Sequence, residues 1–197
     1  MEIFPRIKQH VLHTLKTGLS QNLTYHNLGH TLDVLEQACV IAEHENITNP
    51  DDLLLLQVSA LYHDVGFLKI YSGHEEKSCA IATADLTYFG FNPDQINRVN
   101  GMINATKVPQ SPLTKLEEII CDADLDYLGR DDFYRIAAGL YLEFLEQGIV
   151  KNEQDWDLLQ IRFLESHRYF TKSSLQRRQA KKLAHLQAIK ERVGLFH

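Results

Sequence analysis

The sequence predicts an all-α protein that folds as a single domain of about eight to nine helices. Apolar residues recur at helical spacing along nearly the whole chain, and no stretch shows the strict apolar–polar alternation of a half-buried strand. Capping residues mark most of the helix starts. The 197 residues contain no repeat, low-complexity tract or linker, and this length suits one domain with a sizeable core.

The first three helices are expected over residues 2–17, 27–46 and 50–65. In the third, Asn49 offers a cap and Pro50 takes the first helical position. Residues 53–62 are apolar nearly all round, which predicts that this helix is central and buried. Its last turn carries His63 and Asp64, so these polar side chains should occupy a dry, rigid position that suits a metal site.

Six further helices are expected over residues 73–89, 93–106, 112–128, 131–147, 152–168 and 172–193. Their start signals are capping boxes in Ser72–Glu75 and Asn92–Gln95, the pair Ser111–Pro112, and Thr171 or Ser173. Five glycines follow helical segments, as C′ residues do: Gly18, Gly66, Gly90, Gly129 and Gly148. The final segment, 171–197, is a basic amphipathic helix, for which a solvated basic face is favoured over an anion-binding surface.

The composition indicates a soluble, cytoplasmic protein, with 44% hydrophobic and 23% charged residues. A net charge of −6 argues against binding to nucleic acid or to anionic membranes, because both partners are themselves negative. No secretory signal opens the chain, and its longest apolar run is far shorter than the ~20 residues that span a bilayer. The three cysteines are expected as free thiols, and the ten histidines leave side chains for metal binding or proton transfer.

Three sequence elements carry candidate metal ligands: His26 and His30 of Tyr-His-Asn-Leu-Gly-His, the doublet His63–Asp64, and the pair Asp122 and Asp124. Imidazoles combined with carboxylates are a usual ligand set for a hydrolytic divalent metal ion. His26 and His30 are four positions apart and would share one face of a helix, so one could bind the ion while the other points at the substrate. Periodicity excludes neither Asp122 nor Asp124 as the last ligand, although about 200° separates them on a regular helix.

This order of a histidine, a His-Asp doublet and a distant aspartate resembles the HD superfamily of metal-dependent phosphohydrolases, over roughly residues 20–170. The likeness is greatest to small bacterial predicted HD phosphohydrolases. It implies one HD-type helical domain over residues 1–197 and a divalent ion held by this set: His30, His63, Asp64 and either Asp124 or Asp122. Tyr25-His26-Asn27 and Ala123-Asp124-Leu125 also look like segments of cyclic-nucleotide phosphodiesterases. That second likeness favours Asp124 as the ligand and His26 as the acid that protonates the leaving group.

Four nearby residues are candidates for substrate binding: His74 and Glu75 at a helix start, and Thr106 and Lys107 at a helix end. In some HD branches a histidine in the region of His74 binds a second metal. The structural alternative for Glu75 is a helix start that favours acidic residues, and for Lys107 a lysine that satisfies the last helix carbonyls. The chain has no further histidine between His74 and His167, which argues against the fuller metal set of some di-metal HD enzymes.

The resemblance implies hydrolysis of a phosphomonoester or phosphodiester, in which a metal-bound water attacks phosphorus and His26 protonates the leaving oxygen. Asp64 is expected to bind the ion and to take part in catalysis. The ion could be Mn²⁺, Mg²⁺, Fe²⁺, Co²⁺ or Zn²⁺. The expected partner is a small-molecule phosphate ester, with a nucleotide as the class that relatives imply, and a homodimer is left open. Two alternatives are a di-iron HD-type oxygenase and a non-catalytic module that binds metal and nucleotide.

Overall fold

The computed structural model describes residues 3–195, so the helix start expected at residue 2 lies outside the described residues. Over this range the chain forms nine α-helices, two short 3₁₀ helices and no strand, which confirms the all-α prediction. The elements are, in order, α1 (Ile3–Gly18), α2 (Leu28–His44), α3 (Pro50–Tyr62), η1 (Val65–Leu68), α4 (His74–Tyr88), α5 (Pro93–Ala105), α6 (Lys115–Asp124), η2 (Asp126–Gly129), α7 (Phe133–Glu146), α8 (Glu153–Ser166) and α9 (Lys172–Arg192).

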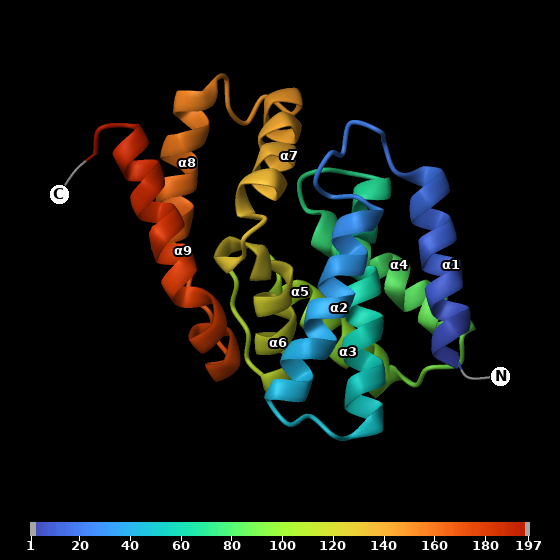
Figure 1. The fold of residues 1–197 in the computed structure, drawn as a ribbon. Helices are drawn as coiled ribbons and strands as arrows, with labels where there is room; N and C mark the ends of the chain where they lie inside the picture. Colours follow the sequence, from blue (N-terminus) through green and yellow to red (C-terminus); the bar gives the residue numbers. More distant parts are fainter. Residues whose placement is uncertain (1–2, 196–197) are drawn as a thin grey trace.

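Helix α3 lies at the centre of a first group of helices, α1–α6 (Figure 1). It packs against α1, α2, α4, α5 and α6. Its side chains Leu55, Leu56 and Tyr62 are fully buried, which confirms the prediction of a central, buried helix. Each such burial stabilises the fold by about 1.5–3 kcal/mol. The carboxyl end of α3 is therefore a firmly held point from which the next residues extend.

Helices α7, α8 and α9 form a second group beside the first (Figure 1). Their apolar side chains meet in a separate cluster that includes Phe133, Trp156 and Ile189. Tyr25, just before α2, and Leu125, just after α6, belong to the same cluster. The start of α2 and the end of α6 therefore lie where the two groups of helices meet.

Side-chain caps fix several helix starts where the sequence predicts them. Asn49 caps α3, Asn92 forms a capping box with Gln95 at the start of α5, and Thr171 caps α9. In each case a side-chain oxygen accepts a hydrogen bond from a backbone N–H that the helix itself leaves unpaired. These helices accordingly begin at the predicted residues.

Two predicted helix starts are wrong. Ser72 does not cap α4. The N-cap position is occupied by Gly73, which adopts the left-handed conformation (φ 78°) and has no side chain to form a capping hydrogen bond. Helix α6 begins at residue 115 instead of 112, because Thr114 and Glu117 form the capping box there. It also ends at Asp124 instead of at residue 128, since η2 follows. The two aspartates of the Asp-Ala-Asp segment therefore lie in the last turn of a short helix.

The five glycines divide into two kinds. Gly90 (φ 86°) and Gly148 (φ 67°) adopt the left-handed conformation expected after a helix. That expectation is wrong for the other three, at which a side chain would crowd a neighbour: Gly18, Gly66 and Gly129. At Gly66 a Cβ atom would lie 1.9 Å from the carbonyl oxygen of His74. The glycine after the His-Asp doublet thus allows η1 to pack directly on the backbone of α4.

The three cysteines are free thiols, as predicted. Within residues 3–195 no helix is both long and apolar enough to cross a membrane.

Candidate metal centre

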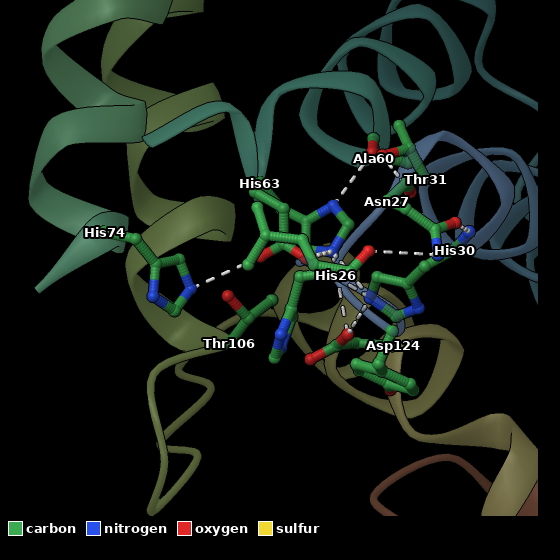
Figure 2. Close-up of polar contacts among 12 residues, drawn as sticks. His26, Asn27, His30, Thr31, Ala60, His63, His74, Thr106 and Asp124 are labelled. Carbon is green, nitrogen blue, oxygen red and sulfur yellow. Dashed lines mark hydrogen bonds and ion pairs between the residues drawn. The ribbon is translucent and has the colours of Figure 1, made fainter. Parts of the chain in front are cut away.

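Side chains from three separate helices converge where the two helix groups meet (Figure 2). His30 lies in the first turn of α2, His63 directly follows α3, and Asp124 is the last residue of α6. The ligand atoms of these three residues all lie within 4.8 Å of one another. The position of His30 is fixed by Asn27, whose side chain accepts hydrogen bonds from the first backbone N–H groups of α2.

Asp64 completes a cluster of two imidazoles and two carboxylates. Its Oδ2 lies 3.1 Å from Nε2 of His63 and 3.3 Å from Nε2 of His30. Oδ1 of Asp124 lies 3.1 Å from the same atom of His30, and the two imidazole Nε2 atoms are 3.2 Å apart. The four side chains predicted as a ligand set from the sequence are thus brought together around one small space.

The hydrogen bond of His63 to the backbone directs its Nε2 atom into the cluster. Its Nδ1 lies 2.9 Å from the carbonyl oxygen of Ala60. A carbonyl can only accept a hydrogen bond, so Nδ1 carries a proton, and Nε2 is the nitrogen that presents a lone pair once the ring is neutral. A hydrogen bond of this kind fixes the tautomer and the ring orientation of a metal-binding histidine.

The charges of the cluster favour ionised carboxylates. Burial alone would raise the pKa of Asp64, but the charge of His63 and hydrogen bonds from the histidines lower it well below the ordinary value. Burial is likewise outweighed at Asp124, whose hydrogen bonds with His30 and His63 lower its pKa to about 2. Burial lowers the pKa of His30, but its hydrogen bonds to both aspartates raise it to about 9. A metal ion that binds these groups must therefore displace a proton from the histidines.

Asp122 lies outside the cluster, so the alternative in which it binds the ion is wrong. Its Oδ1 accepts a hydrogen bond from the N–H of Phe170 (2.8 Å), and its Oδ2 accepts from the N–H (2.8 Å) and the hydroxyl (2.7 Å) of Thr171. Burial raises the pKa of Asp122 to about 6 against the opposing effect of these bonds. The physical reason for its exclusion is the helical rotation of about 200° between Asp122 and Asp124. Asp122 instead ties the segment before α9 to α6.

His26 is held beside the cluster by a residue that the sequence did not single out, Glu143 of α7. Nδ1 of His26 donates a hydrogen bond to Oε1 of Glu143. The backbone N–H groups of Tyr25 and His26 donate to the other oxygen, at 3.0 and 3.1 Å. The hydroxyl of Tyr71 also donates to Oε1, at 2.8 Å, and Phe67 stacks on the imidazole with ring centroids 4.2 Å apart. The ring of His26 is therefore fixed on several sides.

The prediction that His26 and His30 share a helix is wrong. Asn27 caps α2 with an extended backbone (φ −129°, ψ −179°), so the helix begins at Leu28 and His26 precedes it. The two rings are nevertheless neighbours, with centroids 5.9 Å apart. The orientation of His26 is thus set by Glu143 across the helix groups, and helical periodicity has no part in it.

Glu143 could have been noticed from the apolar face of its helix. It follows Phe133, Ala137 and Leu140 at helical spacing, and glutamate is rarely fully buried without a partner. Burial would raise its pKa, but the hydrogen bond and charge of His26 outweigh this effect and lower it. A carboxylate at a core position of an amphipathic helix is the sequence feature that predicts a partner of this type.

His74 approaches the cluster from one side (Figure 2). Its Nε2 lies 3.3 Å from Oδ1 of Asp64, and its Nδ1 lies 3.2 Å from the carbonyl oxygen of Tyr71. By the same argument as for His63, Nδ1 carries the proton and Nε2 faces the carboxylate. The two oxygens of Asp64 thus face different histidines, Oδ1 toward His74 and Oδ2 toward the cluster.

The other three predicted substrate-binding residues line the same cavity as the cluster: Glu75, Thr106 and Lys107. Glu75 is buried, and its Oε2 has no hydrogen-bond partner among the described residues. The hydroxyl of Thr106 donates to the carbonyl of Ile103 at 2.7 Å and keeps acceptor capacity. The Lys107 side chain is 54% exposed at the cavity edge. The structure gathers these residues near the cluster.

Comparisons with known proteins identify the family. The model of the HD domain matches residues 27–126, just over half of the chain and a range that contains the whole cluster. The chain therefore belongs to the HD-domain family. Its fold is similar to the crystal structure of a predicted HD superfamily hydrolase from an uncultured Thermotogales bacterium, with a TM-score of 0.62 and 18% identity over 94% of this chain and 91% of the other. No curated protein sequence matches the chain.

The residues of the cluster fit a divalent metal ion. The donors are two imidazole nitrogens and carboxylate oxygens, a set that suits several first-row divalent ions. Oδ2 of Asp64 is buried and faces the Nε2 atoms of His30 and His63, at 3.3 and 3.1 Å, so the ligand atoms of the set already point toward one another as a bound cation requires. Family membership and this donor set support a metal-dependent hydrolase as the class of protein.

Proposed function

We propose that the protein is a metal-dependent phosphohydrolase, which cleaves a phosphomonoester or phosphodiester bond of a small molecule. The observation that carries the proposal is the position of the His26–Glu143 pair beside the two-histidine, two-aspartate cluster. Ester hydrolysis at phosphorus requires a polarising cation and a proton for the leaving oxygen, and this arrangement offers both. A nucleotide is the first substrate class to test, by analogy with the HD superfamily.

A divalent ion held by the cluster (His30, His63, Asp64 and Asp124) would supply Lewis-acid activation of water and of the phosphoryl group. The protein groups supply proton transfer and orientation. As the water oxygen releases a proton to solvent and forms its bond to phosphorus, the bond between phosphorus and the leaving oxygen breaks. His26 donates a proton to that leaving oxygen from Nε2, because its Nδ1 is engaged by Glu143. The Glu143 carboxylate offsets the positive charge of the doubly protonated ring.

Two groups at the cavity edge are suited to hold the phosphate. The Lys107 ammonium provides a mobile positive charge, and the Thr106 hydroxyl lies next to it in the chain. Glu75 and His74 line the same cavity, where they can orient water by hydrogen bonds. We assign substrate positioning to these four residues, and metal binding to the cluster alone.

Phosphate release from a panel of nucleotides and nitrophenyl phosphate esters, with each candidate ion and with a chelator, tests the proposal. We expect turnover that requires a divalent ion and is lost in Asp124→Ala. The matched control is Asp94→Ala, an exposed aspartate at the start of α5, which should keep full activity. Absence of phosphate release with all five ions would refute the hydrolase. Bound iron with an absorbance band of a mixed-valent pair would instead indicate the oxygenase alternative.

A further inference from the structure

A cavity of about 1020 Å³ extends from the cluster into the space between α7 and α8. Protein interiors are packed about as tightly as organic crystals, so a hollow of this size is not ordinary packing. Its volume is just above the usual range for ligand pockets, roughly 300–1,000 Å³. Asp64 and Asp124 of the cluster, together with His26, line only one part of it. The rest is available to the organic part of a substrate.

The walls far from the cluster are apolar and aromatic. They include Leu140 and Phe144 of α7, and Trp156, Leu159 and Phe163 of α8. All five belong to, or pack against, the apolar cluster of the second helix group. An apolar substituent that leaves water for such walls gains about fourfold in affinity for each methylene group that is buried. The far part of the cavity therefore favours a bulky apolar group.

The charged side chains that line the cavity limit how many phosphate groups a bound substrate can carry. Among the described residues that line it, Lys107 and Arg162 are the lysine and arginine side chains; both are exposed, and Nζ of Lys107 lies 3.5 Å from a carboxylate oxygen of Glu76. The two histidines of the lining, His26 and His74, are paired with Glu143 and Asp64. Three carboxylates, those of Asp64, Glu75 and Asp124, line it as well. A phosphomonoester carries a charge of about −1.5 to −2, which one divalent ion can balance. A triphosphate chain would bring further negative charge without matching cations.

We infer that the substrate is an ester with a single phosphate group and a bulky apolar organic group, which lies between α7 and α8 while the phosphate lies at the cluster. The inference rests on the proposed function and narrows it. The apolar walls select the organic group, and the scarcity of cations selects the monophosphate. In a comparison at constant organic group, a nucleoside monophosphate should be preferred to its triphosphate.

Trp156 is the only tryptophan of the chain and lines the far part of the cavity, so its fluorescence reports occupancy without turnover. The probes are decylphosphonate, below its micelle concentration, and methylphosphonate, whose phosphorus–carbon bonds are not esters. In the presence of Mg²⁺ we expect a saturable change in emission with decylphosphonate at concentrations at least about 100-fold below those needed with methylphosphonate. Equal concentrations for both probes, or no change with either, would overturn the inference.

Hydrolysis then locates the organic group. The kcat/KM for decyl phosphate should exceed that for methyl phosphate, and Phe144→Ala should lower it about tenfold while changing methyl phosphate less than about twofold. The control is Leu142→Ala on the same helix, which is 56% exposed and does not line the cavity. Phosphate release that is equal for methyl and decyl phosphate, or equal for AMP and ATP, would leave the hydrolase standing and overturn the inference. Decylphosphonate binding without hydrolysis of any ester would refute the hydrolase but keep the cavity assignment.

Discussion

Nδ1 of His26 donates a hydrogen bond to Glu143, a residue 117 positions later in the chain and in the other group of helices. The same carboxylate accepts the backbone N–H groups of Tyr25 and His26 and the hydroxyl of Tyr71. Glu143 therefore joins α7 to the segment before α2 at the edge of the metal cluster. A hydrogen bond to a buried charged acceptor is stronger than a neutral one, so this contact is well suited to hold a ring in one orientation.

The first prediction concerns proton donation by His26. His26→Ala should retain the metal ion but lose turnover of an alkyl phosphate by about 10²–10⁴-fold, the usual contribution of a positioned general acid. A nitrophenyl ester needs little protonation of its leaving oxygen and should be affected much less. Metal content by elemental analysis and kcat for both esters check this. Loss of metal from the variant would show that His26 is a ligand, and equal losses for both esters would show that it only positions the substrate.

The second prediction separates Glu143 from a purely structural role. Glu143→Gln keeps the shape of the side chain but cannot offset a positive ring, so kcat for an alkyl phosphate should fall about 10–100-fold. The loss should again be smaller for the nitrophenyl ester. Glu146→Gln, an exposed site on the same helix, is the matched control. A drop in thermal stability with unchanged kinetics would instead assign Glu143 to the fold alone.

The sequence predicted the cluster more fully than its surroundings, and the reason is physical. Three of the ligands lie at helix ends: His30, His63 and Asp64. Capping residues and apolar periodicity define these helix ends, so the positions of the three ligands can be predicted from short segments of sequence. The likeness to a phosphodiesterase segment favoured Asp124 over Asp122, whereas periodicity excluded neither. The contacts of Asp122 with the segment before α9 and of His26 with α7 could not be predicted. Such contacts join distant parts of the chain. Apolar periodicity predicts which face of a helix is buried, but it does not predict which other segment packs against that face.

The third prediction separates the two aspartates of α6. Asp124→Ala should lose the metal ion, because it removes a ligand from the cluster. Asp122→Ala should retain the ion but lower the free energy of unfolding by about 2–4 kcal/mol, since it leaves the part-buried N–H of Phe170 and the buried N–H and hydroxyl of Thr171 without their acceptor. Metal content and urea unfolding of both variants check this. Retention of metal by Asp124→Ala together with its loss from Asp122→Ala would contradict the assignment.

The fourth prediction concerns the glycine that follows the His-Asp doublet. In Gly66→Ala the new Cβ would meet the backbone of α4 at His74, so η1 and α4 must separate at a cost of about 3 kcal/mol. The control is Gly101→Ala inside α5, where the nearest atom is the end of a glutamate side chain and helix propensity favours alanine, so stability should change by less than about 1 kcal/mol. Urea unfolding measures the free energy of unfolding of both variants. Equal values would show that the close approach of Gly66 to the backbone of α4 does not contribute to stability.

The fifth prediction is a pH dependence of stability that originates at His167, which follows α8. Burial, and then the positive charge of Lys182, lower the pKa of His167 to about 3, although Asp124 acts in the opposite direction. Its Nδ1 lies 3.3 Å from Nζ of Lys182, and its Nε2 has no hydrogen-bond partner among the described residues. In the unfolded chain the same histidine takes up a proton near pH 6.5. In the folded protein His167 stays neutral over this pH range. Its contribution to the free energy of unfolding is therefore retained above about pH 6.5 and is lost as the pH is lowered toward about 3.

Substitution His167→Asn removes the titrating group and should flatten this part of the stability profile. Between about pH 7.5 and about pH 5, the Tm of the wild-type protein should fall more than the Tm of the variant. Thermal unfolding followed by far-ultraviolet circular dichroism gives both values, and the comparison cancels the carboxylates that titrate in both proteins. His13→Asn, at an exposed position on α1, is the matched control and should follow the wild-type profile. Parallel profiles for wild type and His167→Asn would mean that His167 is protonated in the folded protein, with Lys182 turned away from its ring.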